Sequence, residues 1–188
     1  MATTIQNFFT KAAEQQFSRD FLFRIKQLTL TGPLPGTVIR FDGESDLVYA
    51  RTATLPGRDI DDKVVNYFGQ EFHIPGRSTY PNSAGYSIEF YHDEDCDLRS
   101  KFEEASRAVF NNETSLGQYG MPGNESVINL VQLDKQLNDV RNIELVGASI
   151  RNIGDIAYSI ADGTGDVLNF SVTFAYHFYR DFGIGVNR

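Results

Sequence analysis

The last part of the chain contains the pattern that most constrains its fold, a long run in which large apolar residues alternate with smaller polar ones. The apolar positions are Leu168, Phe170, Val172, Phe174, Tyr176 and Phe178. The positions between them are Asn169, Ser171, Thr173, Ala175, His177 and Tyr179. Because successive side chains of a strand point to opposite faces, this run predicts one long strand, 168–179, with one face in a core and a polar, uncharged opposite face.

Shorter stretches of the same kind predict further strands, separated by turns rich in Gly and Pro. The expected strands start with the aromatic stretch at Phe21 and continue at 37–41, 47–54, 63–68, 70–74, 86–91, 127–133 and 143–150. Their close spacing favours antiparallel connections over alternating strands and helices. The sequence therefore predicts a mainly β fold, an antiparallel β-sandwich or a partly rolled barrel. The Gly-rich segment 111–126 is expected to be a long loop.

One internal helix is expected at 95–110. Its apolar stripe consists of Leu98, Phe102, Ala105 and Val109. Four acidic residues match the ligand spacing of a calcium-binding EF-hand loop: Asp93, Asp95, Asp97 and Glu104. However, Leu98 stands where that loop needs glycine. An acidic helix N-terminus explains these residues more simply, because carboxylates are favoured at that end of a helix. With the helix, the predicted fold is mainly β with one flanking α-helix.

The chain has 188 residues and a mass of 21.1 kDa, the size of one domain. We expect this domain at 20–182, preceded by an N-terminal helix or arm at 1–19 and followed by a C-terminal tail at 183–188. Apolar residues at helical spacing in the N-terminal segment include Ile5 and Phe9. This segment packs either on its own domain or on a neighbouring subunit, and the sequence favours neither.

Charge and cysteine content exclude several classes of protein. The net charge of −8 argues against a nucleic-acid-binding surface, which needs Lys and Arg to neutralise phosphates. The single cysteine, Cys96, excludes an internal disulfide and a multi-cysteine metal site. The sequence lacks an apolar run long enough to span a membrane, and its N-terminus lacks the basic start and apolar core of a signal peptide. We therefore expect a soluble, acidic, intracellular protein without a membrane anchor.

Catalytic and cofactor motifs are weak throughout the sequence. The three histidines (His73, His92 and His177) are scattered over expected strands or their ends, and no G-x-S-x-G nucleophile motif occurs. The glycines of 163–165 precede a strand, whereas a dinucleotide-binding loop opens a helix. We therefore expect no enzyme activity, no catalytic residues, no cofactor and no metal site.

Seven short motifs follow one another along residues 20–182. They are the aromatic strand 21–25, the small–Leu–Pro turn 53–57, the paired strands 62–76, the strand and acid-capped helix 86–102, and the segments 143–147, 152–155 and 168–179. In this order they resemble the tail tube protein family of contractile-tailed bacteriophages. The chain departs from the family pattern in its longer loop at 31–46 and in its tail after Phe182.

The resemblance implies a structural virion protein whose subunits form hexameric rings. The rings would stack into the inner tail tube, the channel for genome ejection that sheath contraction drives into the host. The implied partners are a tail sheath protein outside the tube, a baseplate initiator and a tail terminator at its ends, and tape measure protein and DNA in the lumen without tight binding. The protein would be made in the host bacterial cytoplasm and located in the virion tail.

We expect the segment 59–76 to contact the adjacent ring, because its two short apolar strands have few positions that fill a core. Candidate residues for contacts between rings or subunits are Leu55, Pro56, Val64, Val65, Tyr67, Phe68, Phe72 and Ile74. Candidate acids of the lumen or outer surface are Asp59, Asp61 and Asp62. A negative lumen would suit a DNA conduit, because a basic wall would bind phosphates and slow transit.

Three other interpretations remain open. Within the same architecture, the chain could be a baseplate protein that initiates the tube or a tube protein of a type VI secretion system. A more distant alternative is a small β-sandwich hydrolase or sugar-binding module. A pocket lined by titratable groups would favour that alternative, and the sequence shows no compact candidate for one.

Overall fold

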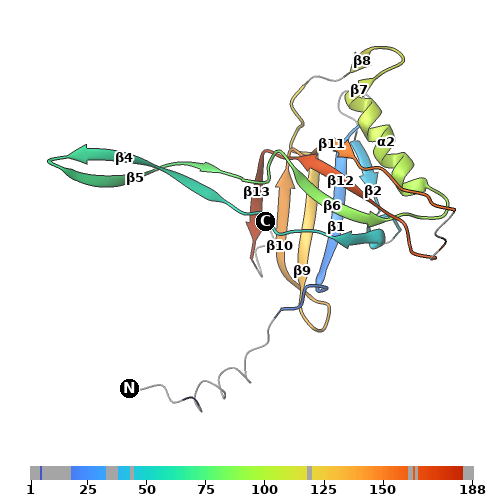
Figure 1. Cartoon of the computed structure of the whole chain (residues 1–188), viewed down its shortest axis with the longest axis horizontal. Coiled ribbons are helices and arrows are strands. Elements are labelled where there is room, and N and C mark those ends of the chain that lie inside the picture. Colours follow the sequence, from blue (N-terminus) through green and yellow to red (C-terminus); the bar gives the residue numbers. More distant parts are fainter. Residues whose placement is uncertain are drawn as a thin grey trace.

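The computed structural model (Figure 1) describes residues 5, 18–32, 38–42, 45–117, 120–160, 163 and 165–183. Its described elements are, in order, β1 (Phe23–Thr31), β2 (Val38–Phe41), the 3₁₀ helix η1 (Leu47–Tyr49), β3 (Ala50–Thr52), β4 (Asp59–Tyr67), β5 (Gln70–Thr79), β6 (Tyr86–Tyr91), α2 (Asp97–Val109), β7 (Phe110–Asn111), β8 (Leu116–Gly117), β9 (Val127–Leu133), β10 (Asp139–Val146), β11 (Ser149–Ile153), β12 (Asn169–Ala175) and β13 (Phe178–Phe182).

Two antiparallel sheets make up the body of the molecule (Figure 1). One has five strands in the order β13-β10-β9-β1-β2, and the other has four in the order β11-β12-β6-β3. All strand pairs within these two sheets are antiparallel. Within the described residues the sheets do not close into a barrel. The expected mainly β sandwich with one flanking helix is therefore confirmed.

The predicted alternation of apolar and polar residues is confirmed along β12. Phe170, Val172 and Phe174 are buried, whereas the residues between them are only half-buried. In the register of the sheet Phe170 lies opposite Phe90 and Val172 lies opposite Ile88, both also buried. Because opposite residues of an antiparallel pair share a face, these side chains form one apolar layer that faces the five-stranded sheet.

Helix α2 completes the core between the two sheets. Phe102, which is fully buried, stacks on Phe41 of the five-stranded sheet with ring centroids 4.5 Å apart. Its ring centroid is also 5.2 Å from that of Phe90 and 6.1 Å from that of Phe174, both in the four-stranded sheet. One helical side chain therefore contacts both sheets.

The acidic residues before α2 cap the helix. A side-chain oxygen of Asp93 accepts hydrogen bonds from the backbone N–H groups of Asp97 (2.8 Å) and Leu98 (3.3 Å). Cys96 precedes the first turn with a left-handed backbone (φ 59°). In the part of the chain that the structure describes, no three His, Cys, Asp or Glu side chains are placed to hold a metal ion. The interpretation as an acidic helix N-terminus is the one the geometry supports.

Two of the predicted long strands are wrong as single strands, because each bends from one sheet into the other. The predicted strand 143–150 is divided at Gly147, whose φ is +70° and whose hypothetical Cβ would overlap the ring of His177. The predicted strand 168–179 ends at Ala175, and the chain resumes at Phe178 in the five-stranded sheet. The two bends lie together, since the His177 N–H donates to the carbonyl oxygen of Val146 at 2.9 Å.

Smaller differences concern the loops. The predicted strand 47–54 is a 3₁₀ turn followed by the short strand β3, with the buried Leu47 in the turn. The expected loop 111–126 includes β8, which pairs with β7. Apart from Ile5, Ser18, Arg19 and Gly183, the expected N-terminal helix or arm and the C-terminal tail lie outside the described residues. No helix among the described residues has the length and apolar character needed to cross a membrane.

Phe102→Ala tests the importance of the helix–sheet contact. We expect it to lower the free energy of unfolding by about 3–5 kcal/mol, because it removes a fully buried ring that contacts both sheets. Val109→Ala, on the exposed end of the same helix, should change it by less than about 1 kcal/mol. Urea denaturation followed by circular dichroism measures both values, and equal losses would contradict this account of the core.

Candidate assembly surfaces

Strands β4 and β5 form a separate two-stranded hairpin that extends sideways from the body (Figure 1). Every residue of β4 is exposed, and so is every residue of β5 except Thr79. A strand of this length spans about 30 Å at about 3.4 Å per residue. An isolated hairpin is only marginally stable in water, so a projection of this length indicates a partner surface.

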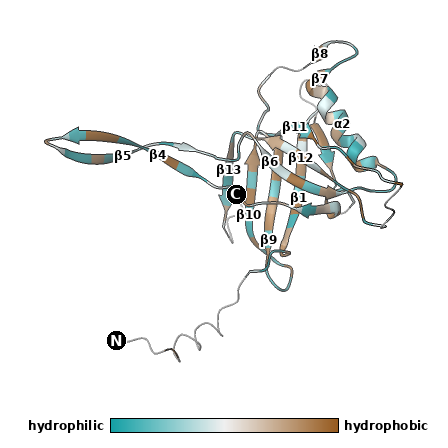
Figure 2. Ribbon diagram, in the orientation of Figure 1, coloured by the Kyte–Doolittle hydropathy of each residue, from teal (hydrophilic) through white to brown (hydrophobic). Residues whose placement is uncertain are grey.

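One face of this hairpin is largely apolar, with Lys63 and Gln70 as its polar members. Val65 lies opposite Phe72, and Lys63 lies opposite Ile74, so these side chains share a face with Tyr67. Val65, Tyr67, Phe72 and Ile74 are between 46% and 64% exposed, and we call them the apolar hairpin face. Figure 2 shows apolar stretches in both strands of the hairpin. Clustered apolar side chains on an exposed strand pair are typical of a protein-binding surface.

The opposite face of the hairpin is largely polar. His73 contacts the carboxylate of Asp62 and lies opposite Val64 in the register. Closer to the body, Asp61 accepts a hydrogen bond from Arg77 Nε at 2.9 Å. Asp59 begins β4 at the base of the hairpin. The three acids proposed for a lumen or an outer surface therefore all lie on the hairpin, and their position relative to a lumen stays a prediction.

The hairpin turn places an aromatic residue in an unfavourable backbone conformation. Phe68 (φ 49°) and Gly69 (φ 75°) both have positive φ, as the central residues of a type I′ turn do. Glycine adopts this conformation freely, whereas a bulky side chain there is strained. Phe68 is nevertheless 89% exposed, with its ring against the edge of Tyr67 at a centroid distance of 4.5 Å. In the isolated chain, the Phe68 ring is therefore not packed into an apolar core.

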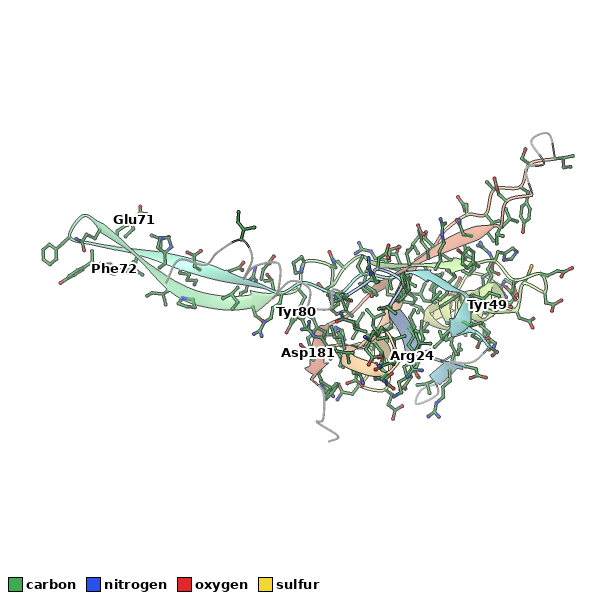
Figure 3. The ribbon with its side chains drawn as sticks, turned by 90° about the horizontal axis from the view of Figure 1, so that it is seen from below. Arg24, Tyr49, Glu71, Phe72, Tyr80 and Asp181 are labelled. Carbon is green, nitrogen blue, oxygen red and sulfur yellow. The ribbon has the colours of Figure 1, made fainter. Side chains whose placement is uncertain are left out.

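Tyrosine contacts hold the base of the hairpin on the body. The Tyr86 hydroxyl donates a hydrogen bond of 2.6 Å to the carbonyl oxygen of Thr54, shortly before β4. Tyr80, which follows β5, contacts the rings of Tyr179 and Tyr176 at centroid distances of 5.3 and 6.4 Å. Figure 3 shows Tyr80 where the hairpin meets the body. Burial, together with the neighbouring Tyr179 and Tyr80, raises the pKa of Tyr176 to about 12. These contacts fix both ends of the hairpin to the core.

The remaining predicted contact residues lie in other places. Val64 is on the opposite face from Val65, although their exposed fractions are nearly equal, 48% and 46%. Leu55 and Pro56 precede the hairpin on the body, with Leu55 exposed and Pro56 buried. The structure therefore brings together four of the eight predicted residues in the apolar hairpin face, and Phe68 lies at the tip beside it.

A second surface, which the sequence pattern did not indicate, is an open groove of about 840 Å³ between the start of β1 and the turn that joins β9 to β10. Its apolar lining consists of Phe21, Leu22, Leu133, Leu137 and Val140, and its charged residues are Arg19, Asp134 and Lys135. We call it the Leu137 groove. The sequence signal that could have revealed this groove is a large apolar residue, Leu137, in an otherwise polar turn. In the structure Leu137 is exposed and has a φ of 63°.

Ion pairs connect strands of the five-stranded sheet beside this groove. Arg24 and Lys26 of β1 both contact Asp139 of β10, and Arg141 of β10 contacts Asp181 of β13. Burial alone raises the pKa of Asp139, but the hydrogen bonds and charges of Lys26 and Arg24 outweigh it and hold this pKa below its usual value. The hydrogen bond from Arg141 lowers the pKa of Asp181, against a smaller opposing effect of burial.

No protein-family model matches the chain, and no curated protein matches its sequence. Solved structures do match it over most of its length. A structure of the anti-feeding prophage baseplate is 12% identical with a TM-score of 0.61, and the match covers 92% of this chain and 99% of that chain. A structure of the sheath/tube terminator of an extracellular contractile injection system, PVC, is 9% identical with a TM-score of 0.55, covering 90% and 99%.

A third structure, of the PVC sheath–tube complex in the extended state, is 11% identical with a TM-score of 0.51, covering 93% of this chain and 97% of that chain. At these identities the likeness establishes a shared fold. The fold expected from the resemblance to tail tube proteins is therefore confirmed. The two PVC structures are described as parts of an extracellular contractile injection system, and the other as a prophage baseplate; none of the three is described as an enzyme.

Asp181→Asn tests the ion pair between β10 and β13. At pH 7 we expect it to lower the stability by at most about 1 kcal/mol, because the Asp181 side chain is 36% exposed. The pKa of Asp181 in the folded state lies below the unfolded value of about 3.9. The ion pair therefore stabilises the fold fully above that value, and this stabilisation is lost as the pH falls through the folded pKa. The difference in Tm between wild type and variant should therefore shrink as the pH falls below about 4. Thermal unfolding followed by circular dichroism measures it, with the exposed Asp155→Asn as control.

Proposed function

We propose that this chain is a non-catalytic, tube-forming protein of a contractile injection particle, whose copies form stacked rings around a central channel. The observation that carries the proposal is the exposed β4–β5 hairpin with its apolar face, attached to a body that shares its fold with parts of such particles. Apolar side chains that stay in water do not stabilise the monomer. Their burial against another copy would stabilise the assembly.

The edges of the five-stranded sheet support ring formation. Within the described residues, β13 pairs only with β10, and β2 pairs only with β1, so each presents an edge of backbone N–H and C=O groups. Exposed edges promote uncontrolled association, and joining edge to edge in a closed ring removes them. The resemblance to tail tube proteins supplies the number of copies, six. Such a ring carries a formal charge of −48, six times the −8 of one chain.

The hairpin connects one ring to the next in this proposal. It extends away from the body, and its contact surface differs from the sheet edges that would close a ring. A contact between two different surfaces of identical chains can repeat from copy to copy, and it builds an open stack when the successive copies do not close into a ring. We propose a sheath around the stack, an initiator and a terminator at its ends, and tape measure protein and DNA in the channel. The acidic chain suits a channel that must release DNA.

A second candidate function is that of a protein at the end of the tube. The matched structures support it, because one is described as a baseplate and another as a sheath/tube terminator. The assembled length separates the two functions. A tube protein polymerises into hollow tubes of many rings, whereas an end protein stops at one or two rings. Negative-stain electron microscopy of the concentrated protein distinguishes these outcomes, and a chain that stays monomeric would contradict both.

The two adjacent valines of β4 provide a matched test of the apolar hairpin face. Val65→Asp should raise the concentration at which the protein assembles by about tenfold or more, because it places an unpaired carboxylate in an apolar contact. Val64→Asp, on the polar face, should shift it by less than about threefold. Sedimentation velocity measures assembly, and circular dichroism checks the fold. Equal effects of the two variants would refute the assignment of the contact to one face.

Phe68→Asn tests whether the strained turn serves assembly. Asparagine adopts positive φ more easily than phenylalanine, so the hairpin amides should exchange their hydrogens more slowly or at the same rate in the monomer. Assembly should nevertheless weaken, because the exposed ring is lost from the contact surface. Hydrogen exchange and sedimentation velocity give the two readings. Unchanged assembly with a better-protected hairpin would show that Phe68 serves no contact.

A further inference from the structure

We propose that the tip of the β4–β5 hairpin of one copy docks into the Leu137 groove of a second copy. The inference rests on the proposed function and names the partner surface that the hairpin contacts. The aromatic tip residues, Tyr67, Phe68 and Phe72, lie against the apolar lining of the groove. Glu71 pairs with Asn66 and therefore lies on the opposite face of the tip from Tyr67 and Phe72. When the tip is inserted into the open groove, this second face meets Arg19 and Lys135. Figure 3 shows Glu71 and Phe72 near the outer end of the hairpin.

The two surfaces are alike in apolar character. The three tip rings are each about half exposed or more. A fully exposed aromatic side chain buries about 150–250 Å², so the exposed parts of these three rings offer roughly 300–500 Å². That is about half of the roughly 800 Å² that each partner contributes to a typical stable interface, so the docked tip adds to the contacts within the rings. The groove has a volume of about 840 Å³, and its exposed residues Phe21 and Leu137 give it an apolar rim.

The charges of the tip and the groove are complementary. Glu71 forms no ion pair within the described residues, and the same holds for Arg19 and Lys135. The acid of the groove, Asp134, accepts hydrogen bonds from the backbone of its own turn, at 2.7 and 2.9 Å, and its charge also interacts with that of the adjacent Lys135. The groove therefore has a net charge of +1, and the tip has a net charge of −1.

Contacts within a single chain already form the floor of the groove. The backbone N–H of Leu133 donates to the carbonyl oxygen of Leu22 at 3.0 Å, and that of Leu22 donates to Arg19 at 3.2 Å. Leu22 and Leu133 are buried with Val131 in a small apolar cluster apart from the main core. A preformed floor reduces the entropy lost on binding, which favours docking over collapse of the groove.

The position of the two surfaces requires a second copy. The hairpin tip lies far outside the body, whereas the groove lies at the end of the sheet where β9 turns into β10 (Figure 1). One chain therefore cannot fill its own groove while its hairpin is held at the base by Tyr80 and Tyr86. Each docked copy leaves a free groove at one end of the pair and a free hairpin at the other, so the contact propagates.

Reciprocal charge reversal tests the pairing. Glu71→Lys and Lys135→Glu should each raise the assembly concentration by about fivefold or more, because each leaves two like charges adjacent. The double variant Glu71→Lys/Lys135→Glu should return to within about twofold of wild type. Glu113→Lys in the turn between β7 and β8 makes the same charge change at an exposed position outside both surfaces, and should have no effect. Sedimentation velocity measures all four variants and wild type, and circular dichroism confirms their folds.

The outcomes separate this inference from the proposed function. Assembly that is lost in Val65→Asp but unchanged in both charge reversals overturns the groove as partner and leaves the proposed function standing. A second outcome is that Lys135→Glu weakens assembly, Glu71→Lys alone does not, and the double variant stays as weak as Lys135→Glu. That outcome assigns the groove to another occupant, such as the N-terminal segment of the same chain. A wild-type protein that never assembles contradicts the proposed function and this inference together.

Discussion

The contact of Phe102 with both sheets is the interaction on which the rest of the structure depends. The two sheets are separate hydrogen-bonded units that are joined where β10–β11 and β12–β13 bend from one sheet into the other, and side-chain packing fills the space between them. Phe102 stacks on Phe41 of one sheet and lies against Phe90 of the other, and the aromatic residues of β12 complete the layer. This rigid body gives the hairpin a fixed base, because Tyr80 and Tyr86 attach both of its ends to the same core.

The body and the hairpin satisfy different physical requirements. The body buries an apolar core within one chain, whereas the hairpin leaves Val65, Tyr67, Phe72 and Ile74 in water. The apolar area of the hairpin therefore contributes little to the stability of the monomer and is available for association. This division allows the chain to fold before it assembles. It also predicts that substitutions on the hairpin change assembly much more than folding.

Two exposed turns violate the same local rule. Phe68 in the hairpin turn and Leu137 in the turn between β9 and β10 both have positive φ, which Gly and Asn adopt more easily than large apolar residues do. Both side chains are mostly exposed. Natural sequences tend to break local preferences at functional sites, where another interaction compensates. The proposed docking of the hairpin tip into the Leu137 groove supplies that compensation for both residues at once.

Residue alternation and turn residues are local features of the sequence, and they determined most strands, the acid-capped helix and the exposed hairpin segment. The strands β6 and β9 have the predicted bounds. Only the tertiary structure decided where the two long strands bend between sheets, because Gly147 must fit against His177 across the fold. The pairing of β4 with β5 placed Val65 and Val64 on opposite faces of the hairpin, because adjacent residues of a strand point to opposite sides. The Leu137 groove joins residues more than one hundred positions apart, such as Phe21 and Leu137, and only long-range packing brings them together.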